Sequence, residues 1–343
     1  MSDAVQIALD AMSGDRGPDV VVDAALHVLG RHSDLELVLV GESRLLETLV
    51  DARRVDPSRR ARLAIEHAAE VVTMTDPPTA ALRKKNASMR VAIDLVKSGR
   101  CHAAVSAGNT GALMAIGRFV LKTIPGIERP AICAALPSRA GRTYVLDLGG
   151  NVNCTSEHLY QFAAMGAVLA EALRGDGEPA RVGLLNIGEE EIKGNDVVKQ
   201  AHELLRRAPL NYVGYVEGYD IFGDKADVVV TDGFVGNVAL KTIEGVANFL
   251  RDNLRAAFSR NLFTRLAGLI AYPVLRDFRR KVDPRRYNGA ALLGLQSIVV
   301  KSHGASDRVA FANAIDIARS AVRFDLPRVI ETRIGLYNGN SAA

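Results

Sequence analysis

The architecture of this chain can be inferred from one segment, Val105-Ser106-Ala107-Gly108-Asn109-Thr110-Gly111-Ala112. It joins an apolar run at 103–105 to a segment with helical spacing at 113–120. At such a strand-to-helix junction, several unpaired backbone N–H groups point at one spot, at the positive end of the helix dipole. A small anion can bind there without a dedicated cation, and we expect phosphate.

The side chains of this junction favour the same ligand. Gly108 and Gly111 let the backbone approach an anion closely, and Ser106, Asn109 and Thr110 add directional donors. The segment matches neither the dinucleotide fingerprint nor the phosphate-loop consensus. The alternative is a polar turn in which Thr110 only caps the following helix.

Composition indicates a globular protein of the cytoplasm. The chain has 343 residues, of which 48% are hydrophobic and 24% charged, so it can bury a substantial core. Residues 1–9 lack the basic and long apolar regions of a signal peptide. A net charge of +4 and a pI near 9.0 suggest an acidic partner. The lack of Trp and the 5% of aromatic residues argue against nucleic acid.

The three cysteines, Cys101, Cys133 and Cys154, are odd in number and not paired at metal spacing. This argues against a disulfide framework or a zinc site, and we expect buried thiols. No acidic pair has a recognisable metal spacing either. We therefore expect neither a metal site nor a cofactor.

Short apolar runs alternate with segments of helical spacing along the chain. The expected strands are 6–9, 35–40, 63–66, 103–106, 131–136, 144–148, 182–186, 228–231 and 297–301, and the expected helices are 19–29, 88–96, 156–173 and 196–206. This alternation predicts an α/β fold, a mostly parallel sheet with helices on both faces, and we treat 1–343 as a single domain. Ligands in such folds bind beyond the carboxyl ends of the strands.

Polar, glycine-rich segments follow five of these strands, at 10–15, 106–112, 147–151, 186–195 and 231–237. If they converge at one edge of the sheet, they form a single cleft. Asp10, Asp15, Asp147 and Asp232 lie at strand ends, where turn and cap roles are the alternative to chemistry. His303, after the last strand, is a candidate base or phosphate ligand, with a structural role as the alternative.

Lys193 and Asn237 are the candidate catalytic residues. Phosphate is itself a nucleophile, so acyl transfer to it needs a held anion, a carbonyl and donors aimed at the developing oxyanion. Lys193, on a Lys-Gly-Asn turn, can pair with either charge, and Asn237, at a helix start, can donate its amide. The structural alternatives are a solvated lysine and a capping asparagine.

Residues 248–286 differ from the rest and predict a helical, apolar protrusion. Its apolar side chains are Leu262, Phe263, Leu266, Leu269, Ile270, Val274 and Leu275, interrupted by Arg265, and Pro273 predicts a break or kink. The run is too short and too charged to span a bilayer. It either packs against a second subunit or touches the membrane interface. A basic cluster favours an anionic membrane or an acidic protein, with a solvated face as the alternative: Arg276, Arg279, Arg280, Lys281, Arg285 and Arg286.

The ordered motifs together resemble the bacterial phosphate acyltransferases of phospholipid synthesis, the PlsX family. They lie at 10–15, 84–89, 106–113, 129–131, 146–152, 184–190, 193–195 and 232–238, and the resemblance covers about 5–325. Departures are mild: Ser13 stands where glycine is usual, and Gly150 and Asn153 replace Ala and Asp.

The resemblance implies a reversible transfer of a fatty acyl group from acyl-[acyl-carrier-protein] to inorganic phosphate, giving an acyl phosphate. It implies a Rossmann-like three-layer α/β/α fold, similar to phosphate acetyltransferases and isocitrate dehydrogenases, and a homodimer. It also implies peripheral association with the inner face of the cell membrane, where a membrane glycerol-3-phosphate acyltransferase would use the product.

By the same resemblance Lys193 and Asn237 match positions expected to be essential, and the 106–112 loop matches the presumed phosphate site. The candidate substrate-binding residues are Asp10, Gly14, Asp15, Ser106, Gly108, Asn109, Thr110, Asn151, Asn186, Asp232 and His303. Alternatives are an acyl-coenzyme A phosphate acyltransferase like phosphotransacetylase, a nicotinamide-dependent dehydrogenase, and a membrane-docking scaffold. A dehydrogenase predicts a dinucleotide fingerprint, which 8–17 lacks.

Overall fold

The computed structural model describes residues 4–339, with side chains except those at 277–282, 284, 286 and 336–339. Its strands are β1 (Val5–Asp10), β2 (Leu35–Gly41), β3 (Leu63–His67), β4 (Ala103–Ser106), β5 (Ala131–Ser138), β6 (Gly141–Leu146), β7 (Val182–Leu185), β8 (Tyr212–Val216), β9 (Val228–Val230), β10 (Ala290–Leu293) and β11 (Ile298–Lys301). They form one sheet in the order β3-β2-β1-β4-β11-β10-β5-β6-β9-β7-β8.

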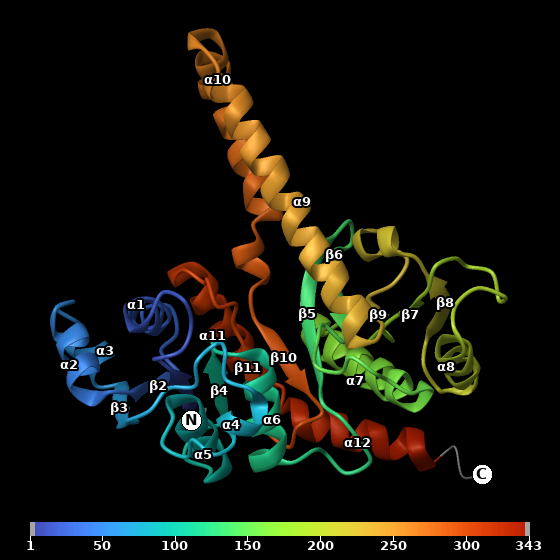
Figure 1. Ribbon diagram of the computed structural model, residues 1–343, viewed down its shortest axis with the longest axis horizontal. Helices are drawn as coiled ribbons and strands as arrows, with labels where there is room; N and C mark the ends of the chain where they lie inside the picture. Colours follow the sequence, from blue (N-terminus) through green and yellow to red (C-terminus); the bar gives the residue numbers. More distant parts are fainter. Residues whose placement is uncertain (1–3, 340–343) are drawn as a thin grey trace.

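The helices connect these strands and cover the sheet (Figure 1). They are α1 (Pro18–Leu29), α2 (Ser43–Asp51), α3 (Pro57–Arg60), α4 (Pro78–Ala81), α5 (Ser88–Lys97), α6 (Thr110–Leu121), α7 (Ser156–Arg174), α8 (Asp196–Arg207), α9 (Gly233–Ser259), α10 (Leu262–Val282), α11 (Arg308–Arg323) and α12 (Leu326–Gly339), with 3-10 turns η1 (Gly218–Phe222) and η2 (Pro284–Tyr287).

The sheet has two groups of parallel strands that run in opposite directions. One group is β3, β2, β1, β4 and β11, and the other is β6, β9, β7 and β8. Between them, β10 is antiparallel to β11 and to β5, and β5 is antiparallel to β6. The predicted mostly parallel sheet is confirmed. The idea that all five polar loops leave one edge of it is wrong, because β10 and β5 reverse the strand direction.

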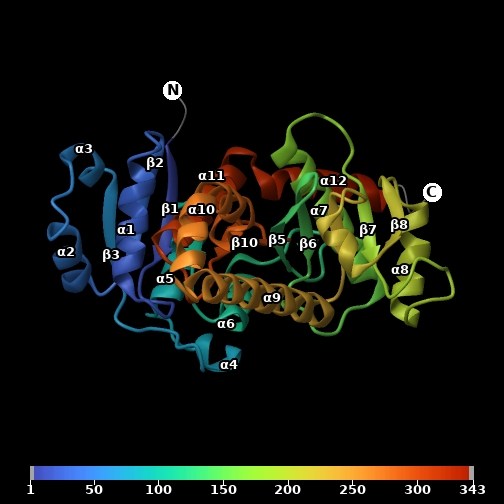
Figure 2. The same cartoon turned by 90° about the horizontal axis from the view of Figure 1, so that it is seen from above.

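Helices lie on both faces, as predicted (Figure 2). On one face α1, α7, α11 and α12 pack over the largest core cluster, in which Phe162 and Phe311 are fully buried. On the other face α5 and α6 cover the first half of the sheet, and the start of α9 covers the second. Met114 of α6 packs against the core of both halves on this face. Helix α6 therefore lies at the boundary between them.

Helices α9 and α10 form a hairpin that projects from the body (Figure 1). The two helices approach closely at Gly268, where a Cβ atom would lie 3.1 Å from the Phe258 ring. Of the break or kink expected at Pro273, the break does not occur, and α10 continues through the proline, although it has no N–H for the Leu269 carbonyl. Leu269 is 71% exposed, so water can hydrate that carbonyl.

The end of this hairpin exposes large apolar side chains. Those more than half exposed are Leu262, Phe263, Leu266, Leu269, Ile270, Tyr272 and Val274. The side chains of Arg279, Arg280, Lys281 and Arg286, which belong to the expected basic cluster, lie outside the described residues. Over the described part of the chain, no helix combines the length and the apolar character that crossing a membrane requires.

Two strands were not expected from the sequence. The short β10 consists of alanines and leucines, which carry no strand signal, and it is enclosed by Gly289 and Gly294, both with positive φ. In β8, Gly214 has φ of 89°, and the pairing register with β7 shifts nearby. Such an irregularity interrupts the alternation by which strands are recognised.

Candidate active site

The loop after β4 is organised by a buried carboxylate. Asp10, at the end of β1, is fully buried and accepts hydrogen bonds from the hydroxyls of Ser88 and Ser106, both at 2.6 Å. The Ser106 hydroxyl in turn accepts from the Gly108 backbone N–H at 3.1 Å. Asp10 and Ser106, two of the predicted binding residues, therefore hold the loop in shape.

Asn109, not Thr110, caps helix α6. Its side-chain oxygen accepts from the Ala112 N–H at 3.0 Å, and its amide donates to the carbonyls of Met74 and Asp76. Both amide hydrogens are thus engaged with the fold. Thr110, the first residue of the helix, is partly exposed at the positive end of its dipole.

The loop after β1 packs directly on this junction. A Cβ atom at Gly108 would lie 2.9 Å from the Ser13 hydroxyl, and one at Gly14 would lie 3.0 Å from Ala107. Gly14 also has φ of 101°. Glycine is needed at both positions, because a side chain would separate the two loops. Ser13 is 4% exposed, and its hydroxyl has no hydrogen-bond partner among the described residues.

The end of β11 completes this side of the site. Lys301 is paired in register with Ser106, and its ammonium donates to the carbonyls of Ala107, at 3.4 Å, and Ser302. The Asp15 N–H donates to the Gly304 carbonyl at 2.9 Å. Three neighbouring parallel strands, β1, β4 and β11, therefore deliver their loops to one place.

His303 adds a titratable group to this place. Its backbone N–H donates to the Asn288 side chain, and its Nδ1 accepts from the Ala305 N–H at 3.1 Å. The pKa of His303 is lowered, chiefly because burial removes water from the ring. The charge of Glu244 raises this pKa, and the charge of Lys241 lowers it. The ring is therefore mostly neutral near pH 7.

In the second half of the sheet, the loop after β6 is built around Asp147. This buried carboxylate accepts from the N–H groups of Ile132, Gly150 and Asn151 and from the Asn151 amide, which also donates to the Pro130 carbonyl. Burial raises the pKa of Asp147, and these hydrogen bonds oppose that rise. Asn151, a predicted binding residue, is 8% exposed and supports the loop.

Helix α9 begins directly on the Asp147 loop. Asp232 caps it, accepting from the N–H groups of Phe234 and Val235, both at 2.9 Å. A Cβ atom at Gly236 would lie only 2.0 Å from the Asp147 carbonyl oxygen, so this position requires glycine. One turn of helix is thereby fixed against the loop, and the first exposed polar side chain after it is Asn237.

One face of α9 connects the two halves of the site. Asn237, Lys241 and Glu244 stand at i, i+4 and i+7, which places them on the same side of a helix. Asn237 lies against Gly149, whose Cβ atom would be 3.4 Å from its side chain. The charge of Lys241 lowers the pKa of Lys301 and of His303, and the charge of Glu244 raises the pKa of His303. This helix face therefore brings loops from oppositely directed strands together.

Lys193 lies farther along the second half, on the loop after β7. Its carbonyl accepts from the Asn186 amide at 3.3 Å, and Gly194, with φ of 91°, packs onto Asn186. The Lys193 side chain is exposed and forms no ion pair with the described residues. No hydrogen bond joins it to Asn237 within that part of the chain. Asn186 therefore shapes the turn that carries the lysine.

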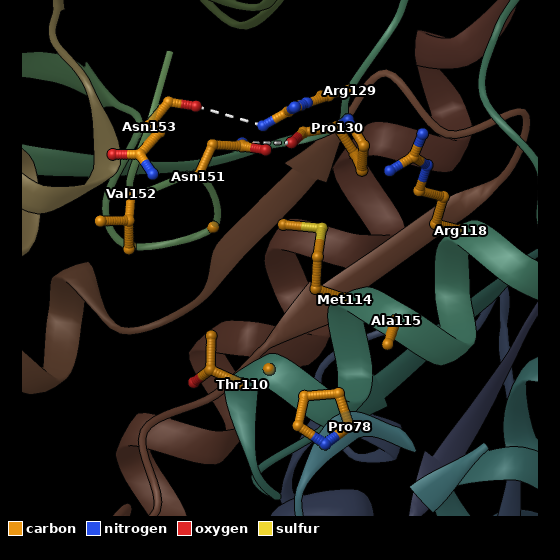
Figure 3. Close-up of a pocket in the computed structure, with 13 residues that line it drawn as sticks. Pro78, Thr110, Met114, Ala115, Arg118, Arg129, Pro130, Asn151, Val152 and Asn153 are labelled. Atoms are coloured by element: carbon orange, nitrogen blue, oxygen red, sulfur yellow. Dashed lines mark hydrogen bonds between the residues drawn. The ribbon is translucent and has the colours of Figure 1, made fainter. Parts of the chain in front are cut away.

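A groove of about 450 Å³ runs between α6 and the loop after β6 (Figure 3). Thr110 and Gly111 lie at one end and Arg118 and Arg129 at the other, and Met114 lies between them. Arg129 donates to the Asn153 carbonyl at 3.1 Å. The arginines make one end of the groove positive, and the start of α6 directs its dipole to the other end, while Pro130, Gly149 and Gly150 also line the groove.

The cysteines are unsuited to nucleophilic chemistry. Burial raises the pKa of Cys101 and of Cys154 to about 11, and it raises that of Cys133 further. A thiolate is scarce at neutral pH under these conditions. Within the described residues, no group of three or more His, Cys, Asp or Glu side chains is placed to hold a metal ion.

Lys241, Glu244 and Lys301 were missed in the sequence, although signals for them exist. Lys301 ends a buried strand, where a lysine is unusual. Lys241 follows the candidate Asn237 by four residues on a helix. The first half of the site is assembled from Asp10, Gly14, Asp15, Ser106, Gly108, Thr110 and His303, and the second half from Asn151, Asp232 and Asn237.

The chain as a whole is similar to known proteins. Residues 5–328 match the family described as fatty acid synthesis protein. The phosphate acyltransferase of Methylococcus capsulatus is 61% identical over 330 residues, and that of Alkalilimnicola ehrlichii is 58% identical over 335. These alignments cover 96% of both chains for the first and 97% of both for the second. A phosphotransacetylase from Streptococcus pyogenes shares the fold, with a TM-score of 0.60 at 17% identity over 93% of this chain and 94% of that one. The chain therefore belongs to the fatty acid synthesis protein family, the PlsX phosphate acyltransferases that its motifs resemble.

Proposed function

We propose that the protein transfers a fatty acyl group from the thioester of an acyl-carrier protein to inorganic phosphate. A phosphate oxygen attacks the thioester carbonyl carbon, and a tetrahedral oxyanion forms. The C–S bond then breaks, the carbonyl is restored in the acyl phosphate, and the carrier thiolate takes up a proton. The thioester is already activated, so no acyl-enzyme is needed.

The observation that carries this proposal is the shared face of α9. It sets Asn237 beside Gly149 in one half of the site, and it carries Lys241, whose charge acts on Lys301 and His303 in the other. The half that contains Gly149 and Asn237 suits a carbonyl that needs a hydrogen-bond donor, and the half that contains the loops of β4 and β11 suits an anion. A phosphate bound at the α6 junction and a thioester bound beside Asn237 are then within reach of each other.

Asn237 donates its amide to the oxyanion as it forms. Its side chain is exposed at the first turn of α9, where the helix dipole also favours negative charge. Lys193, with an exposed ammonium on a turn fixed by Asn186, pairs with the incoming phosphate or with the same oxyanion. Movement of that turn toward α9 on substrate binding would bring the two donors together.

The groove between α6 and the loop after β6 receives the acyl donor. Gly149 lines this groove and lies against Asn237, where the thioester is needed. Arg118 and Arg129 lie at the far end, where they attract the phosphodiester of a carrier's prosthetic group and the acidic surface of the carrier.

The helix hairpin connects the reaction to the membrane. Its apolar tip inserts into the interface of an anionic bilayer, and the parts of the helices nearer the body hold a second subunit in a homodimer. The acyl phosphate, which is insoluble and reactive, is then released where a membrane glycerol-3-phosphate acyltransferase can consume it.

The test compares two acyl donors. The purified protein is given phosphate and either long-chain acyl-carrier protein or the matching acyl-coenzyme A, and the release of free thiol is followed. We expect thiol release with the carrier protein that depends on phosphate. Release from acyl-coenzyme A alone would instead assign the phosphotransacetylase type of reaction, and no release from either would reject the proposal.

A further inference from the structure

The ammonium group of Lys301 is placed in an unusual environment. The residue is half-buried at the end of β11, and its two acceptors are neutral backbone carbonyls, those of Ala107 and Ser302. It forms no ion pair with any described carboxylate. A buried lysine normally has a charged partner, because the loss of hydration is otherwise uncompensated.

A second cation makes this environment less favourable still. The positive charge of Lys241 on α9 lowers the pKa of Lys301, and the Lys241 ammonium is itself paired with Glu244 at 2.8 Å. The charges of Asp15 and Asp10 raise the pKa of Lys301, but neither carboxylate forms an ion pair with it. The net result lowers the pKa of Lys301 to about 8, chiefly by desolvation and then by the charge of Lys241.

A third observation indicates an absent ligand at the same place. The Ser13 hydroxyl is almost completely buried beside Gly108 and is unpartnered within the described chain. A buried hydroxyl without a hydrogen bond is costly, so a ligand that accepts from it would be stabilised. Helix α6 begins two residues after Gly108 and points its dipole toward this place.

We propose that Lys301 and Lys241, with the Ser13 hydroxyl and the start of α6, form the subsite that binds inorganic phosphate. The inference rests on the proposed function for the identity of the anion. A dianion between the two ammonium groups converts their repulsion into attraction, supplies an acceptor to Ser13 and lies at the end of the α6 dipole. This assigns the positive charge of the site to residues that no motif had indicated.

Protonation of Lys301 is then coupled to the binding of phosphate. Without phosphate, the groups facing it are Lys241 from α9, His303 from its own loop, and Asp10 and Asp15 from the end of β1 and the loop that follows. Binding of the anion adds negative charge and raises the pKa of Lys301, so above pH 8 the protein takes up a proton as it binds phosphate. A lysine with a purely structural role would show no such coupling.

The experiment is calorimetric titration of the full chain with inorganic phosphate alone, at pH 8.5, in two buffers that differ in ionisation enthalpy. For the wild type we expect binding with proton uptake. Lys301→Met should bind about tenfold or more weakly and lose the uptake, and Lys301→Arg should keep the affinity without it, because arginine stays protonated. Ser13→Ala should weaken binding several-fold.

Two further variants keep the test independent of folding. Lys241 is exposed, so Lys241→Met should fold. The variant should bind phosphate more weakly. The pH at which binding declines, as Lys301 loses its proton, should also move above 8, since a like charge is removed. Lys97→Met, on the exposed far end of α5, is the matched control and should bind like the wild type. The proposal would be overturned if Lys301→Met kept the wild-type affinity and proton uptake. It would also be overturned if phosphate binding by Lys241→Met declined at the same pH as binding by the wild type.

This result is separable from the proposed function, since no acyl donor is present in the titration. If phosphate binds as expected but the carrier protein is not a substrate, the subsite stands and the acyl donor is wrong. If acyl transfer occurs and the lysine variants bind phosphate normally, the reaction stands and this subsite is wrong.

Discussion

Asn237 and Lys241 lie one turn apart on the same face of α9; Asn237 packs against Gly149 in the loop after β6, and the charge of Lys241 acts on Lys301, which is hydrogen-bonded to the loop after β4. Four residues of helix span about 6 Å. That is a suitable spacing for groups that act on the two ends of a forming bond. The reversal of strand direction at β10 and β5 would separate these loops, and α9 compensates for it by crossing the boundary.

Replacing either candidate donor should reduce turnover while leaving the fold intact. Asn237→Ala and Lys193→Ala each remove an exposed side chain assigned to charge that develops in the transition state. Loss of one such donor costs on the order of a hundredfold in rate. The measurement is kcat at saturating phosphate and acyl donor, with circular dichroism to check folding.

Thr242→Ala is the matched control for Asn237→Ala, since it is exposed on the same helix but off the shared face. It should retain wild-type turnover. A near-normal rate in Asn237→Ala or Lys193→Ala would show that the residue in question is structural.

Two glycines of α9 should respond to alanine in opposite ways. Gly236→Ala puts a Cβ atom 2.0 Å from the Asp147 carbonyl oxygen, so the helix must move off its loop, and we expect a loss of about 3 kcal/mol or more in the free energy of unfolding. Gly245→Ala meets no atom within 4 Å and should stabilise the helix by about 0.5–1 kcal/mol. Urea denaturation measures both. Equal effects of the two substitutions would contradict the close packing of α9 at Gly236 against the Asp147 carbonyl.

The reaction should proceed without an acylated cysteine. All three thiols have raised pKa values, and Cys101 and Cys133 are buried. Replacing Cys101, Cys133 and Cys154 together by alanine or serine should preserve most turnover in protein that folds. Mass spectrometry of wild-type protein mixed with labelled acyl donor should find no acyl-cysteine, and trapping one would disprove direct attack.

The arginine end of the groove should affect the acyl donor more than phosphate. Arg118 is exposed at the mouth of the groove, so Arg118→Glu should raise KM for acyl-carrier protein about tenfold, through repulsion of an acidic carrier, with kcat and KM for phosphate little changed. Arg207→Glu, on the exposed end of α8, reverses a charge far from the groove and should have no effect. An equal rise in KM from both substitutions would show that Arg118 acts only through the net charge of the protein.

Local patterns predicted nine of the strands and several of the helices, but not α2, α11 or α12. The helices α1, α5, α7 and α8 begin and end within one residue of the expected positions, because each has an apolar face, and α1, α7 and α8 also have a proline or a capping side chain at the start. The direction of the strands was not predictable in the same way. It depends on β10, a strand of four alanines and leucines whose pairing is decided by distant segments.

For the site, sequence identified the loops but not the work of each side chain. The strand-to-helix junction predicted at 106–112 is confirmed, yet Ser106 is engaged with Asp10 and Asn109 with backbone groups of α6 and of the loop before α4. Lys301 was missed, because a lysine at the end of a buried strand is only a weak signal, and the effect of Lys241 on it depends on the path of α9. Residues far apart in sequence gain such roles through tertiary contacts, which local spacing does not encode.

The apolar tip of the hairpin should be a membrane contact. Leu266 and Ile270 are 57% and 75% exposed on α10, and insertion into the interface would bury them. Changing both to Glu should release the protein from anionic vesicles, because each substitution loses ~2 kcal/mol of apolar burial and adds repulsion from the headgroups. Vesicle flotation measures binding, and turnover on soluble substrates should remain.

The same double variant separates membrane docking from dimerisation. If the tip meets lipid and the helices nearer the body hold the dimer, the variant sediments as a dimer that no longer floats with vesicles. Leu45→Glu, which places a carboxylate on the exposed side of α2, is the control and should float like the wild type. If the tip is instead the core of the subunit interface, two buried carboxylates facing their symmetry mates would split the dimer. A monomeric variant, or a dimer that still binds vesicles fully, would therefore reject the assignment of the tip to the membrane.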